Sequence, residues 1–220
     1  MSAFPGSPRL VKGGIVLLDP ASGALRQVIS LQYNPDTLSR TVQVKAAGEG
    51  GGDRAQAMRL KGSPVETIKL EAVLDATDRL EYPDRNRDAV RYGVHPQLAM
   101  LEAMAHPSSA ALLANDRLAA SGALEVLPVE SPLALFVWSR SRIVPVRLTD
   151  LSVTEQAFDP ALNPILARVS LGLRVLSVDD LGFRHRGGVL FMNHLRAKES
   201  LAGKAAPGVL SELGLEGLPS

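Results

Sequence analysis

The chain contains no cysteine among its 220 residues. This absence removes disulfides, cysteine-ligated zinc, iron–sulfur clusters and thiol catalysis as classes of chemistry. The four histidines supply no substitute metal signature, because no two of them stand four residues apart with a glutamate between them. We therefore predict no catalytic residue, no metal site and no cofactor, and we expect that the protein is not an enzyme.

Aromatic residues are also scarce, at 4% of the chain, with a single tryptophan. Glycine and proline are plentiful by comparison, with 19 and 15 copies. Hydrophobic residues reach 45%, which is enough for a packed core and excludes global disorder. We expect a core of Val, Leu, Ile and Ala that is interrupted by many turns.

Neither sign of charge is in excess, since 24 Lys and Arg face 23 Asp and Glu. This balance gives no electrostatic footprint for a nucleic acid or an acidic membrane. No apolar run approaches the roughly 18–20 residues that span a bilayer, and residues 1–12 do not resemble a signal peptide. We expect a cytoplasmic protein with no nucleic-acid partner and no membrane insertion.

Alternating patterns predict most of the strands. Two short strands, at 15–18 and 25–33, flank a turn and predict a hairpin. The clearest strand covers 65–74, where apolar and polar residues alternate with a period of two. Residues 143–158 and 165–178 alternate on either side of the turn at 159–164, which predicts a long antiparallel hairpin. The adjacent Asp179 and Asp180 are expected to end that last strand.

Helical signals lie in the middle of the chain and near its end. His95-Pro96 predicts a helix start, and Ser108 or Ser109 is expected to cap a second helix that ends near 122. Residues 75–88 predict a solvated connector, 46–53 a mobile loop and 183–201 an amphipathic helix. Because strands and helices are segregated along the chain, the α+β class is favoured over a doubly wound parallel sheet.

This order predicts three parts of the chain. Residues 1–12 form a flexible N-terminal arm, and 13–180 form a β domain with a helical insertion at about 95–122. Residues 181–220 form a C-terminal helix and tail.

Several short motifs recur in a fixed order along the chain. The triplet Tyr-Asn-Pro at 33–35 closes an early strand, and a later strand ends with Leu-Asp at 74–75. An apolar run then ends on Trp138, and Phe-Asp-Pro at 158–160 precedes Pro-Ile-Leu-Ala-Arg-Val at 164–169. Taken in this order, residues 12–178 resemble the tube-like domain of contractile injection systems, the phage-tail-like machines of bacteria. Ser139 departs from the glycine that usually follows the tryptophan in that family.

The resemblance implies an antiparallel β-barrel or sandwich of phage tail-tube type. It also implies a structural baseplate component that connects the inner tube and spike hub to the sheath or baseplate wedge, within a six-fold ring. Its partners would be the other baseplate, tube, spike and sheath proteins of a particle assembled in the cytoplasm, with release from the cell left open. Baseplate members often continue into a LysM module, and we expect a short form without it. The residues that the resemblance marks as interface or fold determinants are Tyr33, Asn34, Pro35, Trp138, Phe158, Pro160, Pro164 and Arg168.

Two alternatives stay open at this point. The first is an inner-tube or tube-initiator ring subunit of the same particle, although the helical insertion and the tail favour the connecting adaptor. The second, of a different class, is an enzyme or ligand-binding module with an unrecognised α+β fold. We also expect Trp138→Ala to disturb folding or assembly more than any other aromatic substitution.

Overall fold

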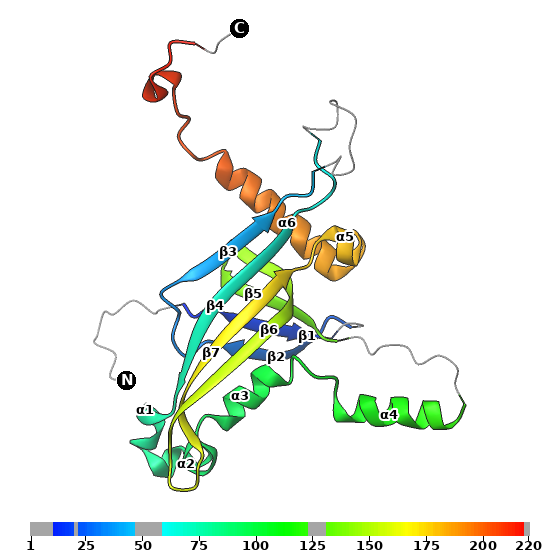
Figure 1. Ribbon diagram of the computed structural model, residues 1–220, viewed down its shortest axis with the longest axis vertical. Helices are drawn as coiled ribbons and strands as arrows, with labels where there is room; N and C mark the ends of the chain where they lie inside the picture. Colours follow the sequence, from blue (N-terminus) through cyan, green and yellow to red (C-terminus); the bar gives the residue numbers. More distant parts are fainter. Residues whose placement is uncertain (1–10, 20–21, 47–58, 123–130, 218–220) are drawn as a thin grey trace.

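The computed structural model describes residues 11–19, 22–46, 59–122 and 131–217. Seven strands and several short helices are arranged as Figure 1 shows. The predicted arm at 1–12 and the glycine-rich loop at 46–53 therefore lie mostly outside the described residues. The strands are β1 (Gly14–Leu18), β2 (Leu25–Ser30), β3 (Leu38–Gln43), β4 (Val65–Asp75), β5 (Leu133–Ser139), β6 (Arg142–Phe158) and β7 (Pro164–Val175). The helices are α1 (Thr77–Leu80), η2 (Pro83–Arg85), α2 (Arg87–Tyr92), α3 (His95–Glu102), α4 (Ser109–Ala120), α5 (Val178–Leu181), α6 (Arg186–Ala202) and η3 (Leu210–Leu213).

All seven strands belong to one antiparallel sheet with the order β2-β1-β5-β6-β7-β4-β3. The structure confirms the α+β class and both predicted hairpins, β1–β2 and β6–β7. It also confirms the alternation of β4, where every second side chain is buried.

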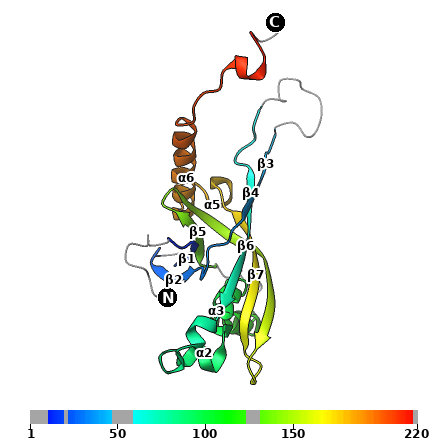
Figure 2. The ribbon, with the colours of Figure 1, turned by 90° about the vertical axis from the view of Figure 1, so that its left-hand side faces the viewer.

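The 17-residue strand β6 belongs to two parts of the sheet at once. Its first residues pair with β5, whereas the stretch from Val146 to Phe158 pairs with β7. The register shifts between Leu148 and Asp150, and such a bulge increases the local twist of a strand. The sheet is consequently bent into two layers. In Figure 1, β1, β2 and β5 lie behind β4, β6 and β7, and Figure 2 shows the two layers from the side.

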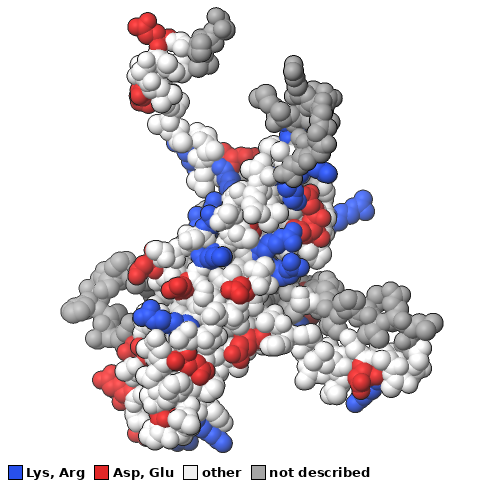
Figure 3. Space-filling model, viewed as in Figure 1, with Lys and Arg blue, Asp and Glu red and all other residues white. Residues whose placement is uncertain are grey.

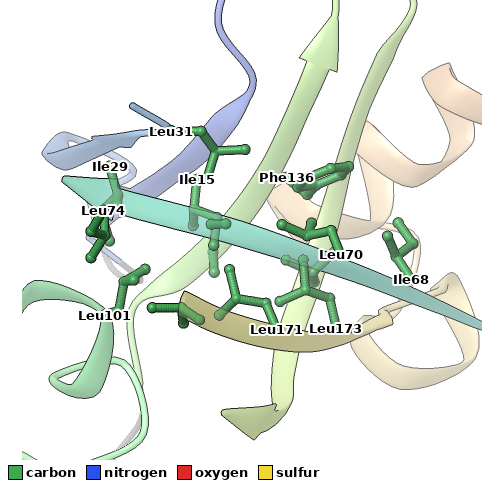
Figure 4. Close-up of a cluster of buried hydrophobic side chains, with 14 of the residues drawn as sticks. Ile15, Ile29, Leu31, Ile68, Leu70, Leu74, Leu101, Phe136, Leu171 and Leu173 are labelled. Carbon is green, nitrogen blue, oxygen red and sulfur yellow. The ribbon is translucent and has the colours of Figure 1, made fainter. Parts of the chain in front are cut away.

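The hydrophobic core fills the space between these two parts of the sheet. Ile15 and Phe136 come from one part, and Ile68, Leu171 and Leu173 come from the other, each with at most 2% exposure. Figure 4 shows these side chains turned toward one another from their different strands. Because strands distant in sequence supply this one cluster, its formation requires the folded-over sheet rather than any single hairpin.

The helical segment that follows β4 starts at Thr77, earlier than the sequence indicated. The stretch 75–88, predicted to be a solvated connector, instead contains α1, η2 and the start of α2. Two backbone hydrogen bonds tie this segment to the start of β7, from the Ala76 amide to the Ile165 carbonyl and from the Val94 amide to the Pro164 carbonyl. The next helix, α3, then buries two leucines against the core.

The C-terminal helices cover part of the sheet. Asp179 and Asp180 lie in the first turn of α5 and do not end a strand, so that expectation was wrong. Asp180 completes a capping box with Ser177, a pattern that satisfies two backbone amides at a helix start. Helix α6 packs on β6 and buries His194. In contrast, α4 buries none of its residues and stands away from the body (Figure 1).

Candidate assembly interface

β2 and β3 are the two edge strands of the sheet. Each has one backbone edge that pairs with no other strand among the described residues. In β2 only Ile29 is buried, and the apolar side chains of Leu25 and Val28 are exposed. In β3 the side chain of Val42 is 45% exposed. Exposed edges of this kind are templates for pairing with another chain. Both ends of the sheet can therefore accept an added strand, which is a general mode of protein recognition.

Two of the predicted residues meet at the glycine that precedes β1. The Asn34 side chain accepts a hydrogen bond from the Gly13 amide at 2.9 Å and donates one to the Val11 carbonyl at 2.8 Å. A β-carbon at Gly13 would lie 2.7 Å from the Trp138 ring, so only glycine fits between these side chains. Trp138 itself is partly buried and stacks on Phe136 with ring centroids 5.8 Å apart. Asn34 and Trp138 thus both position the entry into the first strand.

Tyr33 and Pro35 flank Asn34 in the same connection between β2 and β3. Tyr33 is 41% exposed, and its hydroxyl accepts a hydrogen bond of 3.4 Å from Gln32. Its ring is therefore available to a neighbouring molecule.

Gln32 is a residue that the sequence did not single out. Its amide nitrogen donates to the Asp75 carbonyl at 2.8 Å, and its amide oxygen accepts from the Asp75 amide at 2.9 Å. These two hydrogen bonds hold the loop after β2 against the end of β4, 43 residues further along the chain. No local pattern signals such a contact, because a single glutamine beside a turn has no periodicity.

A second group of predicted residues forms the turn between β6 and β7. Phe158 pairs with Pro164 across the hairpin, and Pro160 lies in the turn itself. Asp159 organises this turn, because its carboxylate accepts hydrogen bonds from the Asn163 side chain and backbone and from the Ala161 backbone. These hydrogen bonds, the one from the Asn163 side chain foremost, hold the pKa of Asp159 below its usual value.

The members of this hairpin differ in their exposure. Pro164 is fully buried, whereas Phe158 is 50% exposed. Arg168 lies on β7, opposite Val73 and Thr154, and its exposed side chain forms no hydrogen bond or ion pair within the described ranges. The eight predicted residues therefore divide into a group near Gly13, a group at the hairpin turn and an isolated arginine.

Charged side chains join α6 to the far end of the β3–β4 pair. The buried carboxylate of Glu66 lies 2.8 Å from Lys198 Nζ and 3.3 Å from Arg40 Nε. A cleft of about 370 Å³ lies beside this cluster, between α6 and the chain that enters β4. On the face seen in Figure 3, Lys and Arg gather over the upper half and Asp and Glu over the lower half.

His194 borders the same cleft with 7% exposure. Its Nδ1 has no hydrogen-bond partner in the part of the chain that the structure describes. Burial, followed by the positive charge of Lys198, lowers the pKa of His194 below its ordinary value of 6.5. The imidazole is accordingly held neutral where α6 docks on the sheet.

The lowered pKa of His194 predicts that the docking of α6 weakens in acid. Above pH 6.5 the ring is neutral in both the folded and unfolded states, and the stability is fully present. As the pH falls below 6.5, the unfolded chain binds a proton that the folded chain resists, so the free energy of unfolding decreases. Urea unfolding between pH 7.5 and 5 should show this decrease, and His194→Gln should reduce the slope. The same substitution at the exposed His106 serves as the control, and an equal change of slope in both variants would refute the assignment.

Within the described ranges, no three His, Asp or Glu side chains gather closely enough to hold a metal ion. No helix in the described part of the chain is long and apolar enough to cross a membrane.

Comparison with known proteins gives only a loose structural similarity. No family model matches the chain, and no curated protein matches it. Among solved structures, the chain is similar to one from the tail of an empty GTA particle with C6 symmetry. That similarity has 12% identity and a TM-score of 0.30, and it covers 74% of this chain and 90% of the other. A similarity of this extent says nothing about function.

Proposed function

We propose that the protein is a structural component of a phage tail-like contractile injection particle. The observation that carries the proposal is the sheet with two exposed edges, β2 and β3, at its opposite ends. A copy that pairs its β2 with β3 of the next copy uses two different surfaces, and such a contact closes into a ring when the rotation allows it. Strand addition around a six-fold ring would cover both edges in every copy.

Within this particle we assign the protein to the baseplate, where it connects the inner tube and spike hub to the sheath or baseplate wedge. The ordered motifs from Tyr33 to Arg168 support this position. Helix α4 and the exposed segment beyond α6 both extend outside the sheet and offer surfaces for contacts beyond strand pairing. A repeating inner-tube ring has little room for such extensions, so the adaptor role is favoured over a tube or tube-initiator subunit.

Electron microscopy of particles isolated from the source cell tests this assignment. We expect density for the chain in one ring at the junction of tube and spike, and we expect a deletion strain to form no complete particles. Density repeated along the whole tube would instead identify a tube subunit. Particles that assemble and inject normally without the protein would refute a structural role.

A lysine in the edge strand should block assembly without unfolding the chain. Val42→Lys places a charge on the exposed edge of β3, and lysine on an edge strand opposes pairing with a further strand. We expect it to abolish incorporation into particles while the free energy of unfolding changes by at most about 0.5 kcal/mol.

The matched control is Val90→Lys in α2, because Val90 is 46% exposed and Val42 is 45% exposed. This control should be incorporated normally. Equal incorporation of both variants would show that the β3 edge is not used in assembly.

A further inference from the structure

Helix α4 has the composition of a buried helix but the exposure of a surface one. Eight of its twelve residues are Ala or Leu, yet none is buried. Leu112, Leu113 and Leu118 are each more than 50% exposed. A helix that is apolar around most of its circumference is ordinarily covered by other protein. The described residues of this copy do not cover α4, so we expect another protein molecule to pack on it.

One face of α4 combines apolar side chains with a single acid. At 3.6 residues per turn, Leu112, Leu113 and Asp116 project from the same side of the helix. Arg117 lies at the margin of this side, one turn after Leu113, and Ala114 and Leu118 project from the opposite side. The Asp116 side chain forms no ion pair or hydrogen bond with any described residue. A partner for this face would therefore supply an apolar surface and one positive charge.

The body of the same chain carries a surface of this kind, which we call the acceptor groove. It encloses about 210 Å³ between β1, β5, β6 and the chain on either side of α4. Arg147 lies on it, is exposed and has no ion-pair partner among the described side chains. The remaining lining is mainly apolar and includes Leu17, Met104, Pro132, Ala134, Val146 and Leu148.

We propose that α4 of one copy docks on the acceptor groove of a second copy, with Asp116 facing Arg147. Met104, which precedes α4 in the chain, and Pro132, which follows it, both line the groove, but the helix itself projects away from the body (Figure 1). An element that extends from its own body in this way can be exchanged between copies. Because helix and groove are different surfaces, repeating the contact links copies head to tail. This inference rests on the proposed ring and adds a second contact between its copies, beside the pairing of β2 with β3.

Charge reversal tests the pairing in the purified full-length chain. Asp116→Arg and Arg147→Asp should each weaken self-association about tenfold or more, because like charges then face each other across the contact. The double variant should restore association to near the level of the unchanged chain. Ala114→Asp, on the opposite side of the same helix, is the control and should associate normally. Sedimentation velocity measures all four variants, and failure of the double variant to recover would overturn the proposal.

Disulfide trapping distinguishes exchange between copies from closure within one copy. The chain has no cysteine of its own, so introduced cysteines report without background. A mixture of Asp116→Cys chains and Arg147→Cys chains should form a cross-linked pair on oxidation. A disulfide that forms only when both cysteines are in one chain, or no disulfide at all, would overturn the exchange. The proposed function is tested separately, by the incorporation of the protein into particles. A failure of the cross-link is therefore distinct from a failure of the proposed function.

Discussion

Replacing Phe136 with alanine is expected to lower the free energy of unfolding by about 3–5 kcal/mol. The Phe136 side chain is 1% exposed and lies between the two parts of the folded-over sheet. Its removal leaves a cavity where side chains from several strands meet, and it also removes the stacked partner of Trp138 at 5.8 Å. Natural domains are stable by only about 5–15 kcal/mol, so the loss is a large share of the total. Urea unfolding, followed by circular dichroism, measures it.

Phe158→Ala is the matched control, because this phenylalanine is 50% exposed at the end of β6. Its unfolding free energy should change by less than about 1 kcal/mol. Trp138→Ala should fall between the two, since Trp138 is only partly buried. From the sequence we expected Trp138→Ala to have the largest effect of any aromatic substitution. The burial of the side chains instead predicts that Phe136→Ala destabilises the fold most. Equal losses in the Phe136 and Phe158 variants would contradict the burial argument.

The strands could be predicted from the sequence because their pattern is local. In β4 the alternation of apolar and polar residues corresponds to the alternation of buried and exposed side chains. In the β6–β7 hairpin the turn signals at 159–164 lie where the structure places the turn, with Asp159 as its organiser. Such features depend on a few neighbouring residues, so one sequence is enough to reveal them.

The features that the sequence did not reveal depend on distant contacts. Nothing in residues 142–158 indicates that one strand pairs with β5 in its first part and with β7 in the remainder. The many charged residues of 77–92 obscure any helical pattern in the sequence. Backbone hydrogen bonds to β7 hold this helical segment in place, and no local sequence pattern predicts them. The predicted interface residues were found by motif, but only the structure shows that Asn34 and Trp138 meet at Gly13.

Replacing Gly93 with alanine is expected to weaken the contact between the helical segment and β7. Gly93 ends α2 with φ of 59° and ψ of −126°, a conformation that residues with a side chain rarely adopt. A β-carbon at this position would also overlap the Pro164 carbonyl, which accepts the hydrogen bond from the Val94 amide. The overlap adds about 1–3 kcal/mol to a backbone strain of roughly 1–3 kcal/mol, because a ψ of −126° lies outside the left-handed helical region.

Gly122→Ala separates these two costs. Gly122 has φ of +83°, but no atom among the described residues lies within 4 Å of the position of its β-carbon. Its variant should therefore lose only the backbone contribution, roughly 1–2 kcal/mol, whereas Gly93→Ala loses the steric contribution as well. Thermal unfolding should show a clearly lower midpoint for the Gly93 variant, and hydrogen exchange should show faster exchange at the Val94 amide. Equal midpoints would mean that the Pro164 carbonyl can move aside, and that the tie between the helices and β7 contributes little to the stability of the sheet.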